Sequence, residues 1–331
     1  MNSNDQYDET PLHLACTEGN LECVKILQTH AADIDNKNED EQTPCHLAAI
    51  NGQVEVLKFL IENDPSAIFD KDENDKTSLH LASENKHAGA LEVLLQNGAH
   101  VQEKNSKDWT ALDCAASVGA TQCVKVLLEF DAPVDPIDRT HTTPLHLACE
   151  GGHHKTVEIL MENGADVTLE DIYGQNALEI AISRGRKSAT KAILDSNKWR
   201  DAMRATNKMV NPHGTIVPDT PMRMLIRTFP DLAEDVFDKC ISAKKLKNNK
   251  GHDDTNDKKS VDFDYEFIDD TFCLKFMEES EQYEYCPVDE NNQCQLFPSP
   301  YNNNGAVRMT NHPLMIMANQ KQKVIMFFSA G

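Results

Sequence analysis

The chain of 331 residues has no long apolar run. A helix needs roughly 20 consecutive apolar residues to span a bilayer, and the most apolar stretches, 313–318 and 324–330, are much shorter. The N-terminal sequence MNSNDQYDET has no apolar segment of the kind that a secretory signal requires. Taken alone, the chain has no membrane segment and is expected to be cytoplasmic.

Positive charge is also scarce. The sequence holds 32 lysine and arginine residues against 54 aspartate and glutamate residues, and its formal net charge is −22. Proteins that bind nucleic acid normally present a basic patch. The charge balance therefore argues against a nucleic-acid partner.

The short motifs of common catalytic chemistry are missing too. The sequence has no glycine-rich phosphate loop, no nucleophile elbow and no HExxH pair. Its many carboxylates are dispersed in polar loops, which is typical of a solvated surface. We therefore predict that the protein is not an enzyme and has no catalytic residue and no cofactor.

Ten cysteines are present, but none of them forms a CxxC pair. The spacings are too wide for a zinc knuckle, so we predict no metal site. Cys16 and Cys149 follow the same phrase of a repeat, and Cys23 and Cys123 share another repeat position. Recurrence at one position is typical of small core residues, because a thiol packs as a small apolar group.

One phrase recurs through the first part of the chain. Residues 10–15 and 143–148 both read TPLHLA. Weaker copies begin at Thr43, Thr77, Thr110 and Asn176, so that successive copies start 33, 34, 33, 33 and 33 residues apart. A fixed period of this size indicates stacked repeats, and the period together with this wording resembles the ankyrin repeat. The resemblance implies an all-α fold, a solenoid of two-helix repeats.

The residue types of the phrase suit the start of a helix. Threonine can cap a helix by accepting a backbone N–H, and proline fits the first helical position, where its missing N–H costs nothing. Histidine recurs once per repeat, which cannot place several ligands around one metal ion, so we expect it to bond a neighbouring loop. Gly98 and Gly164 suit the end of the second helix of a repeat. Weaker ends are expected at the aligned positions Ala31, Asp64, Asp131 and Asn197.

The period divides the chain into four segments. We expect residues 1–9 to be a truncated lead-in and 10–198 to hold six repeats. Residues 199–318 are expected to form a small mixed helical and β linker region, and 319–331 a divergent tail. Because repeat one is apolar and only nine residues precede it, we expect the chain to begin inside a longer array. The alternative is that repeat one itself caps the array.

The loops between repeats are acidic and polar. In repeat arrays such loops project as fingers beside the concave face and carry contacts to partner proteins. Composition does not separate that role from a simple solvated connection, so a protein partner on the concave face and a passive loop are both open at this point.

The linker contains two predicted amphipathic helices, 221–228 and 231–241. Met222, Leu225, Ile226 and Phe229 form an apolar stripe that indicates a small local core. Residues 244–259 lack apolar character over most of their length and are expected to be a disordered loop, whereas 261–268 alternate aromatic and polar side chains as a strand does.

The order of phrases in the linker adds a second resemblance. Trp199 is followed by TPMRMLI at 220–226, FPDLA at 229–233, DYEFIDD at 264–270 and NHPL at 311–314. This order resembles the linker between the ankyrin repeats and the first membrane helix of the ankyrin-type transient receptor potential (TRPA) cation channels. The resemblance implies coupling roles in the linker for Trp199, Pro221, Met222, Leu225 and Pro230.

The same resemblance implies a function. The chain would be the cytosolic ankyrin-repeat and linker part of a nonselective cation channel that couples thermal or chemical stimuli to the pore. Such channels are homotetramers in the plasma membrane, and their membrane domain would follow residue 318. The alternative is a soluble ankyrin-repeat adaptor that mediates protein–protein interaction.

Two cysteines are candidates for modification by electrophiles, as implied by the resemblance. Cys240 stands where chemically gated members have a reactive linker cysteine, and Cys273 is a looser match. The sequence departs from those members at Thr220, where they have cysteine, and at Asp219, where they have lysine. We therefore expect a weak electrophile sensor that responds to heat, in which Cys240 reacts faster than Cys16 or Cys149. The alternative is that Cys240 is an ordinary thiol near a helix end.

Overall fold

The structure is a computed structural model that describes residues 5–204, 207–210, 216–245, 259–263, 274–276 and 283–285. These residues form two compact units. The first unit comprises residues 1–181 and 188–196, and the second comprises 182–187 and 197–331.

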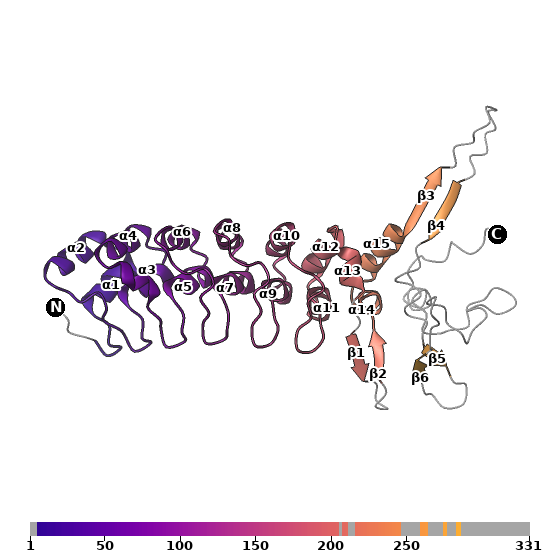
Figure 1. The fold of residues 1–331 in the computed structure, drawn as a ribbon, viewed down its shortest axis with the longest axis horizontal. Helices are drawn as coiled ribbons and strands as arrows, with labels where there is room; N and C mark the ends of the chain where they lie inside the picture. Colours follow the sequence, from indigo (N-terminus) through magenta and orange to yellow (C-terminus); the bar gives the residue numbers. More distant parts are fainter. Residues whose placement is uncertain are drawn as a thin grey trace. The chain divides into compact units, whose positions relative to one another are not determined.

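The first unit is built from consecutive helix pairs (Figure 1). The pairs are α1 (Pro11–Glu18) with α2 (Leu21–Thr29), α3 (Pro44–Ile50) with α4 (Val54–Asn63), α5 (Ser78–Glu84) with α6 (Ala88–Gln96), α7 (Ala111–Val118) with α8 (Thr121–Glu129), and α9 (Pro144–Gly151) with α10 (His154–Glu162). The next helices are α11 (Ala177–Ser183) and α12 (Lys187–Asp195), at the boundary of the two units.

First helices pack on first helices, and second helices pack on second helices. Contacts run from α1 through α3, α5 and α7 to α9, and separately from α2 through α4, α6 and α8 to α10. The loops that join one pair to the next extend beyond the row of first helices (Figure 1). This two-layer stack confirms the predicted ankyrin-repeat solenoid.

The recurring phrase begins each first helix. Thr10, Thr43, Thr77 and Thr143 are N-cap residues, and in each case the histidine three residues later completes a capping box. The imidazole Nδ1 accepts the threonine N–H at 3.1–3.2 Å. Prolines 11, 44 and 144 occupy the first helical position, as expected.

The other ring nitrogen ties each repeat to a loop. With Nδ1 accepting, Nε2 carries the proton and donates to a loop carbonyl 3.1 Å away, on Gln42, Asp70, Glu103 and Leu169 in turn. This confirms the structural role predicted for the four histidines. Burial lowers their pKa, that of His46 to about 4, and so keeps the rings neutral.

The ends of the second helices follow the glycine pattern in part. Gly98 and Gly164 have φ of 92° and 98°, the left-handed region that glycine favours. Ala31 and Asp131 also adopt positive φ, 57° and 59°, which strains the backbone because each residue carries a Cβ. Asp64 instead is extended, with φ −140°, and is the N-cap of the 3-10 helix η1 (Pro65–Phe69), which follows the second helix of the second repeat.

The first repeat leaves apolar side chains exposed that are covered in the other repeats. Leu14 is 50% exposed, whereas its counterparts Leu47, Leu81, Cys114, Leu147 and Ile180 are 2–9% exposed. Cys23 is also exposed, although Cys123 at the same position is buried. The expectation that both are core thiols is therefore right for Cys123 and wrong for Cys23, because no described repeat packs over it.

The second unit mixes short helices and strands. Its helices are α13 (Trp199–Met203), α14 (Pro221–Thr228) and α15 (Pro230–Cys240). Its antiparallel strand pairs are β1 (Asn207–Val210) with β2 (Ile216–Asp219), β3 (Ile241–Lys245) with β4 (Lys259–Phe263), and β5 (Leu274–Phe276) with β6 (Tyr283–Tyr285). The mixed character predicted for the linker is confirmed.

The two predicted linker helices are present. The bounds of α14 agree with the prediction, and α15 begins one residue earlier than expected, at Pro230. Strand β4 covers the start of the predicted strand, and residues 264–268 lie outside the described residues, as do the NHPL phrase at 311–314 and the tail 319–331. The predicted disordered loop was placed too wide, because residues 244 and 245 belong to β3 and residue 259 to β4; its other residues lie outside the described part of the chain. The hairpin of β1 and β2 was not predicted. Among the residues described here, no helix combines the length and apolar character needed to cross a membrane.

Candidate functional site

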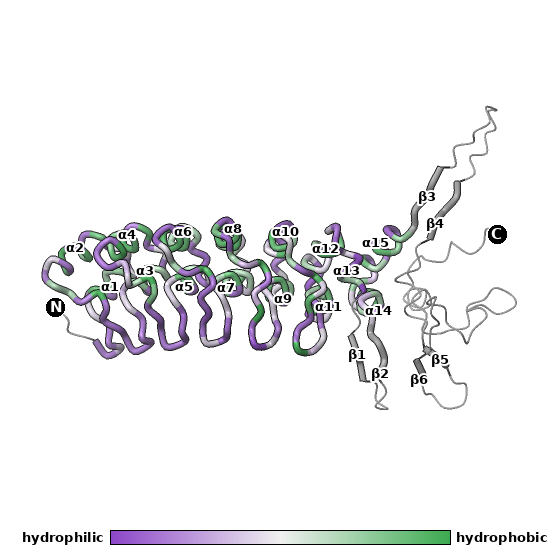
Figure 2. Tube along the Cα trace, viewed as in Figure 1, coloured by the Kyte–Doolittle hydropathy of each residue, from purple (hydrophilic) through white to green (hydrophobic). Residues whose placement is uncertain are grey.

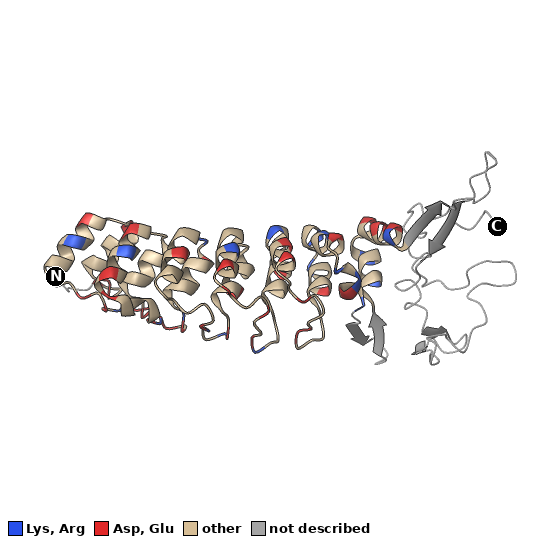
Figure 3. Cartoon of the chain, turned by 45° about the horizontal axis from the view of Figure 1, so that its top comes forward, with Lys and Arg blue, Asp and Glu red and all other residues tan. Residues whose placement is uncertain are grey.

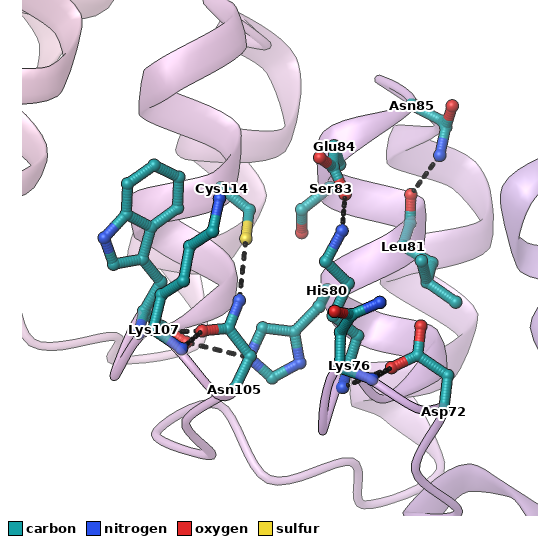
Figure 4. Close-up of polar contacts among 12 residues, drawn as sticks. Asp72, Lys76, His80, Leu81, Ser83, Glu84, Asn85, Asn105, Lys107 and Cys114 are labelled. Carbon is teal, nitrogen blue, oxygen red and sulfur yellow. Dashed lines mark hydrogen bonds and ion pairs between the residues drawn. The ribbon is translucent and has the colours of Figure 1, made fainter. Parts of the chain in front are cut away.

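The loops along one edge of the first unit share a turn that the phrase analysis overlooked. A four-residue segment that we call a fingertip lies shortly before each first helix; the six fingertips are 5–8, 38–41, 72–75, 105–108, 138–141 and 171–174. Every fingertip begins with Asp or Asn, and its side-chain oxygen accepts backbone N–H groups two and four residues later at 2.8–3.1 Å. Figure 4 shows Asp72 and Asn105, which begin two neighbouring fingertips. Since this Asp or Asn recurs with the repeat period, the signal was present in the sequence.

Backbone hydrogen bonds join neighbouring fingertips. The second residue of a fingertip donates its N–H to the third residue of the preceding one in four steps: Glu39 to Tyr7 at 3.1 Å, Glu73 to Asp40 at 3.2 Å, Ser106 to Asn74 at 3.0 Å, and Ile172 to Thr140 at 3.0 Å. Two lysine side chains add further ties, from Lys37 to the Lys71 carbonyl and from Lys104 to the Ile137 carbonyl, at 3.0 and 2.9 Å. The fingertips therefore form a row of fixed spacing.

Trp109 holds the middle of this row together. Its Nε1–H donates to an Asp138 carboxylate oxygen on the next loop at 3.0 Å. The Lys107 ammonium lies 4.9 Å from the centre of the tryptophan ring. Arg139 and Asp108, on adjacent fingertips, make two contacts of 2.8 and 3.3 Å. Such a combination of aromatic and guanidinium groups is typical of protein-binding surfaces.

The row changes in character from one end to the other. Fingertips 38–41 and 72–75 carry exposed carboxylates, at Glu39, Asp40, Glu41, Glu73 and Asp75. The last fingertip instead exposes Ile172 (53%) and Tyr173 (76%), and Ile137 (46%) lies just before the fingertip preceding it. Figures 2 and 3 show the polar loops and the acidic residues along them.

Below the third fingertip lies a partly buried ion pair. The Lys76 ammonium contacts the Glu84 carboxylate at 2.6 Å (Figure 4). Cys114 is close by, with the Asn105 amide 3.9 Å from its sulfur. Burial, and secondarily the negative charge of Glu84, raise the pKa of the Cys114 thiol to about 12. This thiol is therefore chemically inert at neutral pH.

Asp113 occupies the place of the phrase histidine in the fourth repeat. Its Oδ2 accepts both the N–H and the hydroxyl of Thr110 at 2.8 Å, which preserves the cap. Its Oδ1 is buried and has no hydrogen-bond partner among the described residues. Burial raises the pKa of this carboxyl to about 7. The substitution is visible in the sequence, because residues 110–115 read TALDCA where residues 10–15 and 143–148 read TPLHLA.

The linker residues singled out by the sequence fall into two groups. Pro221, Met222 and Leu225 lie buried in α14, and Pro230 is the first residue of α15. Trp199 begins α13, and its ring lies 4.7 Å from the Arg200 guanidinium carbon and 5.9 Å from the Lys239 ammonium near the end of α15. The structure thus brings Trp199 to α15, while the α14 residues form the local core that was expected.

Cys240 is the last residue of α15 and is 3% exposed. Cys273 lies outside the described residues. Among the cysteines that the structure describes, Cys23 is the exposed one. Within that same part of the chain, no group of three or more His, Cys, Asp or Glu side chains could hold a metal ion.

Comparison with known proteins extends this picture. Overlapping segments of the chain, 1–70, 28–105, 66–139, 97–171 and 132–203, match the family of ankyrin repeats (three copies). The chain is also 31% identical over 331 residues to the transient receptor potential cation channel subfamily A member 1 homolog of Caenorhabditis elegans. That match covers 97% of the chain and 27% of the relative, so the chain spans about a quarter of the relative's length.

The match to the channel homologue extends through the linker as well as the repeats, because it covers nearly the whole chain. The resemblance that the linker phrases indicated is thereby confirmed. The repeat matches cover residues 1–203 with the helix pairs and capped phrases described above. The chain therefore belongs to the ankyrin-repeat family.

Proposed function

We propose that the chain is the cytosolic ankyrin-repeat and linker part of a nonselective cation channel of the TRPA type, which couples thermal or chemical stimuli to pore gating. The observation that carries this proposal is the 31% identity to the channel homologue over 97% of the chain, linker included. In this proposal the parent protein is a homotetramer in the plasma membrane, and the chain lies on its cytosolic side. It carries no catalytic role.

The linker is the proposed route of coupling. Trp199 contacts Lys239 on α15 by a cation–π interaction, and α14, in which Met222 and Leu225 are buried, packs on α15. A displacement of α13 would therefore be transmitted to α15 through side chains already in contact. Pro221 and Pro230 define where these helices begin.

A chimera tests this proposal. The aligned region of the C. elegans homologue would be replaced by this chain, and both surface expression and cation currents would be recorded during heating and during exposure to an electrophile. We expect surface-expressed tetramers that open on heating. A chimera that reaches the surface as a tetramer but never conducts would contradict the coupling role.

A Trp199→Ala chimera then tests the coupling route itself. We expect normal surface expression but a shifted temperature threshold, because the contact to α15 is lost while the repeats are unchanged. A Tyr7→Ala chimera is the control, since Tyr7 is an exposed aromatic residue of the first unit, outside α13 to α15.

A soluble ankyrin-repeat adaptor that mediates protein–protein interaction is the second candidate function. It is favoured by the exposed Ile172 and Tyr173, since apolar side chains on a rigid surface loop are typical of a protein-binding site. The two functions are compatible, because a channel's cytosolic repeats can also bind a partner protein.

A further inference from the structure

The fingertips differ most at their second and third residues. These two positions read Gln6-Tyr7, Glu39-Asp40, Glu73-Asn74, Ser106-Lys107, Arg139-Thr140 and Ile172-Tyr173 along the row. Only the last pair is apolar and aromatic together. Ile172 and Tyr173 are 53% and 76% exposed, and Tyr173 is the most exposed of the large apolar side chains in the described part of the chain.

This last fingertip is held rigidly. Asp171 accepts the N–H groups of Tyr173 and Gln175 at 2.8 and 2.9 Å, and the Ile172 N–H bonds the neighbouring fingertip at 3.0 Å. Gly174 supplies the left-handed residue that completes the turn, with φ 72°. A side chain presented on a loop that is already ordered loses little entropy when a partner covers it.

The opposite stretch of the row is strongly acidic. Fingertips 38–41 and 72–75 together hold six carboxylates and no lysine or arginine. Of the lysines that precede them, Lys37 pairs with Glu41 of the first of these fingertips at 3.4 Å, whereas Lys71 pairs with Glu103, outside both, at 2.7 Å. The other five carboxylates of the two fingertips, all of them described by the structure, have no ion pair to either lysine. The electrostatic complement of this stretch is a partner segment rich in lysine or arginine.

We propose that the fingertip row binds an extended segment of a partner protein whose basic side chains face fingertips 38–41 and 72–75 and whose aliphatic or aromatic side chains cover Ile137, Ile172 and Tyr173. This deepens the partner-binding role proposed above and rests on it. Packed helices lie about 10 Å apart, so the four steps from fingertip 38–41 to fingertip 171–174 span roughly 40 Å. An extended chain covers that distance with about 12 residues.

A random library of 12-residue peptides displayed on phage, selected on the whole chain, tests the proposal. We expect the enriched peptides to combine lysine or arginine at one end with aliphatic or aromatic residues at the other. Enriched peptides would then be synthesised, and their affinity for variants measured by fluorescence anisotropy. Circular dichroism would confirm that each variant keeps its helix content.

The matched variants come from the fingertips themselves. Tyr173→Ala should weaken binding about tenfold, the loss typical of truncating a hot-spot aromatic. Tyr7→Ala is the control, because Tyr7 holds the same place in the first fingertip, is 57% exposed and should leave affinity unchanged. The double variant Glu73→Gln/Asp75→Asn should weaken binding and flatten its salt dependence.

Several outcomes would overturn the proposal. They are the absence of enrichment, enriched peptides without basic residues, and equal effects of Tyr7→Ala and Tyr173→Ala. A dimer in sedimentation that dissociates on Tyr173→Ala would also overturn it, by showing that a second copy covers the surface. None of these results bears on whether the chimera conducts, so failure here and failure of the channel function are distinguishable.

Discussion

At the scale of the residue, Asp113 is the position where the repeat pattern and the local chemistry conflict. Four other repeats place a histidine there, which both accepts from the cap and donates to a loop carbonyl. An ionised aspartate has no proton to donate, and Asp113 is only 1% exposed to solvent. The site therefore favours the protonated acid, which explains the direction of the pKa shift.

This shift predicts a pH-dependent stability difference between wild type and Asp113→Asn. Burial raises the pKa of the folded-state carboxyl to about 7, against about 4 in the unfolded chain. The folded state then binds the extra proton, so this group's stabilising contribution is present below about pH 4 and is lost as the pH rises to about 7. Asparagine does not titrate, so the variant should gain stability relative to wild type between pH 5 and pH 8.

Urea unfolding at a series of pH values measures this difference. The charged groups around Asp113 are Asp138, which raises its pKa, and Lys104, which lowers it. The buried histidines act in the opposite direction because their pKa values are lowered, but both proteins share them. Stability curves that stay parallel from pH 5 to pH 8 would show that Asp113 does not titrate in this range.

A second prediction concerns the left-handed residues that end the second helices. Ala31→Gly should stabilise the chain by roughly 0.5–1 kcal/mol. Glycine removes the backbone strain that alanine has at φ 57°, and this gain outweighs the larger conformational entropy of glycine in the unfolded chain. The reciprocal change Gly98→Ala should destabilise by about 1 kcal/mol. A Cβ at Gly98 would meet no atom within 4 Å, so the loss of stability in Gly98→Ala would come from backbone strain alone. Thermal unfolding of both variants, with opposite signs expected, checks the argument.

At the scale of the element, stability comes from the interfaces between neighbouring helix pairs. Each first helix buries apolar side chains against the next first helix, and such an array is stabilised by the sum of these interfaces. The exposed Leu14 and the buried Leu147 occupy the same position of the phrase in different repeats. They allow the interface contribution to be measured with one substitution type.

Leu147→Ala should cost roughly 2–4 kcal/mol of unfolding free energy, since Leu147 is 7% exposed and its removal leaves a cavity. Leu14→Ala should change stability by less than about 0.5 kcal/mol, because Leu14 is 50% exposed. Denaturant unfolding of both variants tests the assignment. Equal losses would mean that the first repeat is covered in solution, for instance by a second copy of the chain.

At the scale of the whole molecule, thiol accessibility ranks the cysteines. We predict that Cys23 is alkylated first, Cys240 next, and Cys16 and Cys149 last. Cys23 is exposed, whereas burial raises the pKa of the Cys16 thiol to about 12 and that of Cys149 still further. Timed alkylation with mass spectrometry measures the order. Labelling of Cys240 no faster than Cys16 would remove any sensor role for it.

The sequence predicted much of the repeat architecture because the repeat signals are local. A threonine, a proline and a histidine within four residues determine a helix start wherever they occur. The same holds for α14, whose threonine cap, first-position proline and apolar stripe lie within a few residues of each other. The β1–β2 hairpin was missed because its strands are four residues each, too short for an alternating pattern to be recognised. The fingertip turns were missed because they carry no apolar pattern, although the recurring Asp or Asn was available as a signal.

By itself, the sequence determined the repeat period, the capped helices, the histidine ties and the likeness of the linker to a channel family. These depend on residues close together along the chain, or on the order of phrases. Only the tertiary structure decided that Leu14 and Cys23 are exposed and that Asp113 is buried with no hydrogen-bond partner for Oδ1 among the described residues. It also decided that Ile172 and Tyr173 lie at the end of a row of fingertips joined by hydrogen bonds. Each of these depends on which neighbouring repeat covers a side chain, and repeats of nearly the same sequence differ in that respect.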